Sequence, residues 1–274
     1  MFADLHMHTI HSDGTNTPYE LCTLAKSHGI QVISITDHDT IAGHKALSDE
    51  QTNSVRVISG IEISTEINRK MLHILGYYID IFDERLERFI HDISVEKTET
   101  TRVNFEAARE SNVFEYKWER VLELNRGQPR ISGPHVVNAM KTDGYEVPGM
   151  GLWDMFRKCF WPENDNYLSN QTFTAYDAID IIKAIGGIPV IAHPKTIGND
   201  DIVLDLIRYG AQGIEVYHPK HTAHDTLKYL QMAENKKIYV SGGTDWHGEN
   251  SGTEITQFGM CGLKKNEFPI LDYK

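Results

Sequence analysis

The chain has 274 residues, of which 40% are hydrophobic and 24% are charged, and this composition excludes a largely disordered protein. Its 39 acidic and 27 basic residues give a net charge of −12, which disfavours general binding to nucleic acids or anionic membranes. One small phosphorylated ligand remains compatible with this charge, because bound cations can reverse the field inside a single pocket.

Cysteines and apolar runs indicate the expected compartment. Cys22, Cys159 and Cys261 are odd in number and far apart, so neither a disulfide framework nor a thiolate zinc site is expected. No apolar run reaches the ~20 residues of a membrane span, and the first residues lack the basic segment and apolar core of a signal peptide. The expected location is a reducing cytoplasm, with no membrane association.

Short apolar runs alternate with longer amphipathic runs, the pattern of strand–helix units. Thr17, Pro18 and Glu20 predict the start of the first helix as N-cap, first helical residue and capping partner, and Gly29 ends it. This alternation favours an α/β barrel, with a doubly wound open sheet as the alternative. Strands are predicted at 2–8, 32–36, 55–62, 71–79, 189–192, 213–217 and 238–242, and further helices at 42–48, 83–110, 175–185, 201–209 and 223–235.

One segment departs from this rhythm. Residues 111–172 carry 7 basic and 8 acidic residues, nearly neutral in an acidic chain, and hold three of the four tryptophans. We therefore expect 1–110 and 173–274 to form the barrel. We expect 111–172 to form a small helical insertion that caps the substrate, with its clearest helices at 118–124 and 134–141.

Histidines and carboxylates follow the predicted strands. His6 and His8 lie two residues apart at the end of the first strand, so both rings point to the same side. The carboxyl ends of barrel strands converge on one face, where active sites are built. Imidazoles and carboxylates without cysteine suit Zn²⁺, Mn²⁺ or Fe²⁺. The other strands supply Asp37, His38, Asp39, Glu62, His73, His193, Glu215, His218, Asp245 and His247.

Each of these motifs also has a plain structural explanation when taken alone. Asp37-His38-Asp39 suits a turn with Asx caps, and His73 lies among apolar residues like a buried core histidine. Because coincidence at six strands is improbable, a metal site is the better interpretation.

These residues resemble the polymerase-and-histidinol-phosphatase (PHP) family. The resemblance implies a distorted (β/α)₇ barrel with two or three divalent metals, and is strongest to stand-alone phosphoesterases that carry a helical insertion before the His-Pro strand. The matching segments are Asp4-Leu5-His6-Met7-His8 with Ser12-Asp13-Gly14, Ile35-Thr36-Asp37-His38, Gly60-Ile61-Glu62, His73, Ala192-His193-Pro194 and Thr244-Asp245-Trp246-His247.

The resemblance also implies nine metal ligands. A first metal would be held by His6, His8, Glu62 and Asp245; a second by Glu62, His73 and His193; and a third by Asp13, His38 and His247.

The activity implied is that of a metal-dependent phosphoesterase, in which a metal-bridged hydroxide attacks a phosphate ester. The expected substrate is a 3′,5′-nucleoside bisphosphate or a nucleoside monophosphate. The alternatives are a cyclic phosphodiesterase acting on phosphoribosyl 1,2-cyclic phosphate and an enzyme acting on a short RNA end. Outside this class stand a metal-dependent amidohydrolase and a non-catalytic PHP regulatory domain.

Other residues are candidates for substrate contact. His218 is the candidate general acid for the leaving oxygen, with packing as its alternative role. Arg130 and His135 are candidates for clamping a phosphate, although related proteins often have arginine where this chain has Gly133. The tryptophans Trp118 and Trp153 would stack a base or form the core of the insertion.

Overall fold

The computed structural model describes residues 1–48, 52, 55–161, 164, 167–169, 172–249, 251, 257–265 and 270, and within these no helix is long and apolar enough to cross a membrane. Their central element is a seven-stranded sheet in which neighbours follow chain order. The strands are β1 (Ala3–Asp4), β2 (Val32–Ile35), β3 (Arg56–Ile67), β4 (Lys70–Tyr77), β5 (Ile188–Ile191), β6 (Gly213–Tyr217) and β7 (Tyr239–Gly242).

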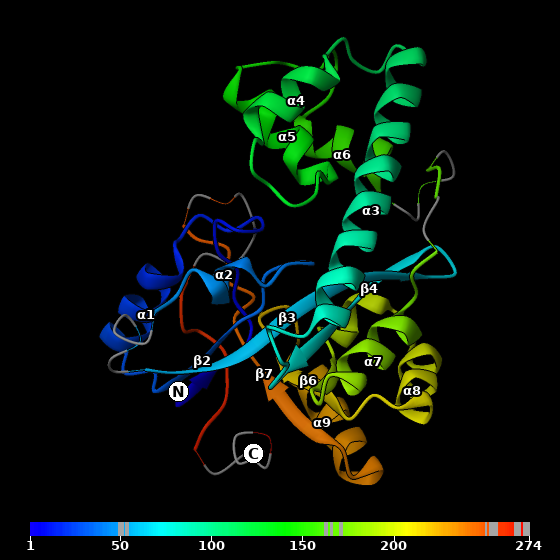
Figure 1. Cartoon of the computed structure of the whole chain (residues 1–274). Coiled ribbons are helices and arrows are strands. Elements are labelled where there is room, and N and C mark those ends of the chain that lie inside the picture. Colours follow the sequence, from blue (N-terminus) through cyan, green and yellow to red (C-terminus); the bar gives the residue numbers. More distant parts are fainter. Residues whose placement is uncertain are drawn as a thin grey trace.

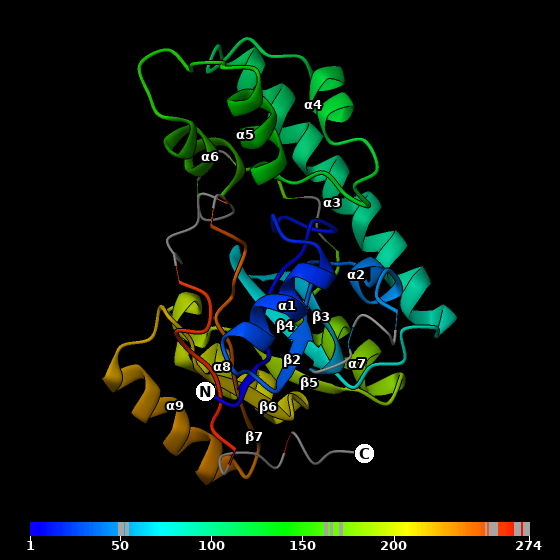
Figure 2. The same ribbon diagram turned by 90° about the vertical axis from the view of Figure 1, so that its left-hand side faces the viewer.

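The two edges of this sheet meet beyond β1 and β7. Leu5 donates its backbone N–H to the carbonyl of Gly242 at 3.1 Å, and His8 donates to the carbonyl of Trp246 at 2.8 Å. The segment after β1, predicted as a continuation of the strand, therefore joins the last strand and nearly closes the sheet into a barrel (Figures 1 and 2). The predicted barrel is confirmed.

The strand β4 runs antiparallel to both of its neighbours, whereas the other neighbouring pairs are parallel. It follows β3 through a two-residue turn in which Asn68 and Arg69 have φ of 51° and 63°, the backbone of a tight hairpin. So short a connection can join only antiparallel strands. β3 also continues to Ile67, beyond its predicted end, and His73 lies inside β4 opposite Ser64 rather than at the carboxyl end of a parallel strand.

Helices cover the outside of the barrel. α1 begins with the predicted capping box, in which Thr17 Oγ1 accepts the N–H of Glu20 at 3.2 Å. α7 packs closely on β4 because Gly76 has no side chain; a Cβ there would lie 2.9 Å from Ile182 Cγ1. These elements are α1 (Pro18–Ser27), α2 (Ala42–Lys45, shorter than predicted), α7 (Ala175–Ala184), the 3₁₀ helix η2 (Pro194–Ile197), α8 (Asp200–Tyr209) and α9 (Ala223–Lys236).

The helices between β4 and α7 stand above one end of the barrel (Figure 1). The long helix α3 (Glu84–Glu110) leaves the barrel, and α4 (Trp118–Leu124), α5 (Gly133–Thr142) and α6 (Leu152–Phe160) pack on its distal half. They share a core of their own, which begins with Phe105 on α3. α4 and α5 match the predicted helices, whereas the nine-residue α6 was not predicted.

Candidate metal centre

Imidazole and carboxylate donors gather at one face of the barrel in three overlapping groups. In each group, every residue offers a donor atom that lies within 4.8 Å of the others. Three residues, His8, His38 and Glu62, each belong to two of the groups. The groups are His6, His8, Glu62 and Asp245; His38, Glu62 and His73; and His8, Asp13, His38 and His247.

Glu62, which is fully buried on β3, lies at the centre of this cluster. Its Oε1 lies 2.8 Å from His73 Nδ1 and 3.1 Å from His193 Nε2. Its Oε2 lies 3.1 Å from His6 Nε2 and 3.2 Å from both His8 Nε2 and His38 Nδ1. Burial alone would raise the pKa of Glu62, but the surrounding histidines hold it well below its usual value. Glu62 is therefore an anion at neutral pH, and its two oxygens contact five imidazole rings.

Several of these buried donor atoms make no hydrogen bond. They include His6 Nε2, His8 Nε2 and Glu62 Oε2, which converge on one point, and Asp13 Oδ1 beside them. Burying such atoms unsatisfied is costly, and a shared divalent cation would satisfy them together. The imidazole nitrogens and carboxylate oxygens of the set are the donors that Zn²⁺, Mn²⁺ or Fe²⁺ accept. The residues present therefore fit a metal centre.

Supporting residues fix the orientation of the donor rings. Glu215 on β6 accepts a hydrogen bond from His6 Nδ1 at 3.0 Å and from the backbone N–H of His193 at 2.8 Å. Because Nδ1 of His6 is engaged, its Nε2 lone pair faces the cluster, the usual arrangement of a histidine that ligates metal. Among the strand residues considered as donors, Glu215 is not one of the nine predicted ligands; an acidic residue inside the apolar strand 213–217 is a signal that it faces the barrel interior.

Backbone conformation at this face is also unusual. Asp39, His193 and Asp245 have φ of 50°, 26° and 53°, in the region that non-glycine residues rarely adopt. Each such conformation costs of order 1–3 kcal/mol and persists where its surroundings impose it. Three such residues on one face indicate that the positions of the side chains, rather than the conformational preference of the backbone, determine the local path of the chain.

His218 lies behind the cluster. Its Nδ1 accepts the backbone N–H of Lys220 at 3.1 Å, so in the neutral ring Nε2 carries the hydrogen and points to Asp245 Oδ2, 3.3 Å away. Burial lowers the pKa of His218 despite the nearby Asp245 carboxylate. These contacts make it a positioning residue for Asp245, and the predicted general-acid role stays a prediction.

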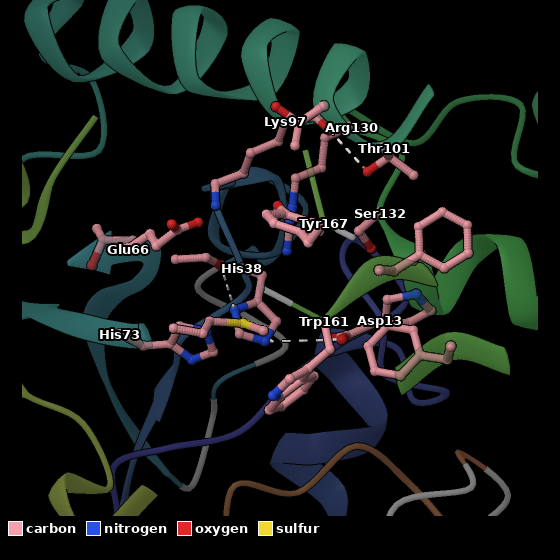
Figure 3. Close-up of a pocket in the computed structure, with 18 residues that line it drawn as sticks. Asp13, His38, Glu66, His73, Lys97, Thr101, Arg130, Ser132, Trp161 and Tyr167 are labelled. Atoms are coloured by element: carbon pink, nitrogen blue, oxygen red, sulfur yellow. Dashed lines mark hydrogen bonds and ion pairs between the residues drawn. The ribbon is translucent and has the colours of Figure 1, made fainter. Parts of the chain in front are cut away.

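A cavity of about 240 Å³ adjoins the cluster on the side of the helical insertion. Asp13, His38 and His73 line its barrel side, as Figure 3 shows. Two cations, Lys97 and Arg130, line it from α3 and from the loop before α5. Four aromatic side chains complete the wall: Phe156, Phe160, Trp161 and Tyr167.

The two residues of the predicted phosphate-binding pair have different surroundings in the structure. Arg130 lines the cavity and pairs through Nε with Asp39 Oδ2 at 3.1 Å. His135 is buried in α5, where its Nδ1 accepts the N–H of Ser132 at 3.1 Å as part of the helix cap. Burial and the charge of Arg130 lower the pKa of His135 to about 4, so the ring is neutral at pH 7. Its role in binding substrate stays a prediction.

Gly133 has a packing reason. A Cβ at this position would lie 2.6 Å from Phe156 Cε2 and 2.8 Å from Phe160 Cβ, so no larger residue fits without a shift. Trp118 is buried in the core of the insertion, 5.3 Å from the Phe105 ring, which is the structural alternative considered for it. Trp161, which was not singled out, lines the cavity instead.

Comparison with known proteins gives consistent relatives. The chain is 28% identical over 256 residues to phosphoribosyl 1,2-cyclic phosphate 1,2-diphosphodiesterase of Eggerthella lenta, covering 91% of this chain and 95% of that protein. It is 28% identical over 263 residues to 3′,5′-nucleoside bisphosphate phosphatase of Chromobacterium violaceum, covering 91% and 88%. A Bifidobacterium adolescentis structure, assigned provisionally as a metal-dependent phosphoesterase, superposes with a TM-score of 0.82 at 26% identity, covering 97% of this chain and 94% of that one.

The family model described as PHP domain matches residues 4–146, more than half of the chain. The match includes six of the clustered donors: His6, His8, Asp13, His38, Glu62 and His73. The chain therefore belongs to the PHP domain family.

Proposed function

We propose that this metal-dependent phosphoesterase of the PHP family hydrolyses a phosphate ester of a small nucleotide, either a 3′,5′-nucleoside bisphosphate or a nucleoside monophosphate. The observation that carries the proposal is that one cavity joins the donor cluster, represented by His38 and His73, to aromatic side chains such as Trp161 and Tyr167. A phosphate suits the first part and a stacked base the second. The activity of the Chromobacterium violaceum relative supports this reading.

The nine predicted ligands are part of the proposal, with two or three divalent ions (Mn²⁺, Zn²⁺ or Fe²⁺). The first predicted set coincides with one geometric group. The second predicted set differs from its geometric group, because His38 takes the place of His193 beside Glu62 and His73; His193 contacts Glu62 but is not part of that group. The third predicted set gains His8 beside Asp13, His38 and His247. The carboxylate of Glu62, which belongs to two groups and offers two oxygens, is the candidate for sharing between neighbouring ions, whereas His8 and His38 would each bind one ion of the two groups to which they belong.

The chemistry divides between the ions and the chain. Divalent ions held here would make water nucleophilic near neutral pH and neutralise the charge that develops on phosphoryl oxygens. The chain keeps the donor rings oriented through Glu215 and through Thr196, whose hydroxyl lies 2.8 Å from His193 Nδ1. Asp4 accepts both the N–H and the hydroxyl of Thr244, at 2.9 and 2.7 Å, which ties the last loop to the first strand. A pre-organised site of this kind needs little rearrangement during reaction.

Two other substrates compete with the nucleotide. Phosphoribosyl 1,2-cyclic phosphate is favoured by the Eggerthella lenta relative, and the same ligands would serve it, but it carries no base for the aromatic wall. A short RNA end stays a further prediction. Replacing Trp161 by alanine discriminates between them: loss of a base stack raises KM for nucleotides about 10-fold, whereas KM for the cyclic sugar phosphate stays unchanged.

The test of the activity is phosphate release from a panel of substrates by the purified, Mn²⁺-supplemented protein. We expect turnover of nucleoside bisphosphates or monophosphates, and loss of turnover together with bound metal in Glu62→Gln. The matched control is Glu234→Gln, on the exposed surface of α9, which keeps both. Exclusive turnover of the cyclic phosphate, or of amide substrates, contradicts the proposal.

Two structural expectations belong to the same proposal. The insertion 111–172 acts as the substrate cap, which is supported by the cavity wall that Arg130, Phe156 and Phe160 contribute. A cytoplasmic location is supported by the cysteines, since Cys22, Cys159 and Cys261 are all free.

A further inference from the structure

Lys97 brings to the cavity a positive charge that the reaction at the donor cluster does not use. The residue lies on α3, lines the cavity and is partly buried. Figure 3 shows its side chain descending from α3 next to Arg130, toward His38 and His73. Its ammonium makes no hydrogen bond, and no ion pair within 4.0 Å, with any residue in the described part of the chain.

The ammonium is nevertheless largely charged at neutral pH. Burial lowers the pKa of Lys97 to about 8, the nearby Asp39 opposes this shift, and Arg130 adds to it. A buried cation without a close partner is costly. An anionic ligand would remove that cost.

The carboxylates around Lys97 are engaged with other groups. Asp39 accepts the backbone N–H of Ser64 at 2.8 Å and faces Arg130. Glu66 accepts the Ser169 hydroxyl at 3.3 Å. The third one, Glu96, accepts the N–H of Thr172 at 2.9 Å. They moderate the charge of Lys97 but leave its ammonium open to the cavity.

A second group with no partner lies beside Lys97. Thr100 also lines the cavity, and its hydroxyl, although buried, makes no hydrogen bond. Residues 97 and 100 are three positions apart and therefore share one face of α3. Arg130, on the loop before α5, lies next to Lys97 (Figure 3). Two cations and a buried hydroxyl thus line the cavity from α3 and from the loop before α5, facing the donor rings His38 and His73.

We propose that Lys97, Thr100 and Arg130 form a second phosphate subsite, which binds a phosphate group that the enzyme does not hydrolyse. The proposal rests on the proposed function and narrows it, because the preferred substrate then carries two phosphate groups on one ribose. One phosphate lies at the donor cluster, and the other lies between α3 and Arg130. Charge-assisted hydrogen bonds from guanidinium and ammonium groups are the strong kind that such an anion needs. Gly133 cannot contribute, since it has no side chain and no room for one.

The test compares Lys97→Met with wild type on a nucleoside 3′,5′-bisphosphate and a nucleoside 5′-monophosphate. Removing one charge-assisted contact to the second phosphate should raise KM for the bisphosphate about 30-fold, with a much smaller effect on the monophosphate. Lys97→Arg should restore most of the preference. The matched control is Lys158→Met, an exposed lysine of α6, which should behave as wild type.

Two outcomes overturn the subsite. If KM rises equally for both substrates, Lys97 binds the reacting phosphate; if neither KM changes, it binds no anion. Calorimetric binding of the bisphosphate and monophosphate separates the subsite from the activity. Where wild type binds the bisphosphate more tightly and Lys97→Met abolishes that difference, the subsite stands even if neither nucleotide is hydrolysed. Equal binding of the two nucleotides by wild type overturns it.

Discussion

The barrel face and the helical insertion line one cavity, but they are built on opposite physical terms. At the barrel face, Glu62 and the surrounding rings are charged or polar and buried, and the rings are fixed by hydrogen bonds to acceptors such as Glu215. Between α3 and the insertion, apolar packing around Phe105 and Phe114 builds a separate core, and only a few polar side chains reach the cavity. The proposed chemistry therefore depends on pre-organised donors, whereas the proposed substrate selection depends on where helices place isolated groups such as Lys97.

Metal removal should affect the barrel face most strongly. We expect a chelator to abolish phosphate release and Mn²⁺ or Zn²⁺ to restore it, because the donors converging on Glu62 Oε2 lose their shared partner. With free metal at 100 times its Kd, binding stabilises the folded protein by about 3 kcal/mol. Metal analysis, activity and thermal unfolding measure the three effects. Full activity in a metal-free preparation would contradict the distinction between the two regions.

Loss of a supporting residue should cost less than loss of the metal. In Glu215→Ala, His6 loses the acceptor for its Nδ1 hydrogen and its Nε2 is no longer held toward the cluster. Supporting groups of this kind typically contribute 10–100-fold to metal affinity or activity, and we expect a decrease of about that size. Glu215→Gln, which keeps an acceptor oxygen, should retain more. Metal titration followed by activity distinguishes weakened binding from a defect that saturating metal does not repair.

The donors were predictable from the sequence because each follows a local signal. His6 and His8 share one side of an extended segment through their spacing, and Asp245 and His247 follow a short apolar strand. The hairpin was harder: the strand pattern around His73 was visible, but its direction depends on the two-residue turn at Asn68 and Arg69.

Residues of α3 and of the insertion gave no comparable signal. Lys97 lies on a long helix rich in charged residues, and nothing local distinguishes it from the solvated lysines of the chain. Its burial results from the fold placing the loop of Arg130 and the aromatic wall opposite that face of α3. Trp118 was likewise a candidate for stacking a base while Trp161 was not singled out, and tertiary packing alone sends the first into a core and the second into the cavity wall.

A core substitution where α3 packs against the insertion tests whether the two regions are separable. Phe105 is fully buried, and its ring lies 5.1 Å from Phe114 and 5.3 Å from Trp118. Phe105→Ala should lower the free energy of unfolding by about 4 kcal/mol and raise KM, while bound metal stays unchanged because no donor lies in this core. Thermal unfolding and metal analysis measure both. Metal loss in step with the unfolding of the insertion would show one cooperative unit instead.

The smallest expected effect is a pH dependence of substrate preference, which tests the proposed role of Lys97 on α3 in binding the second phosphate. Burial lowers the pKa of Lys97 to about 8; among charged groups nearby, Asp39, Glu66 and Glu96 oppose this shift and Arg130 adds to it. Below pH 8 the ammonium is charged and binds a second phosphate; above it the charge is lost, so the preference for bisphosphate over monophosphate should fall. A bound phosphate raises the pKa of Lys97. Because the pH dependence of kcat/KM reports the pKa of the free enzyme, kcat/KM for the bisphosphate should still fall near pH 8. Arginine keeps its charge throughout this range, so Lys97→Arg should show a flat preference, and an identical decline in that variant would assign the effect to another group.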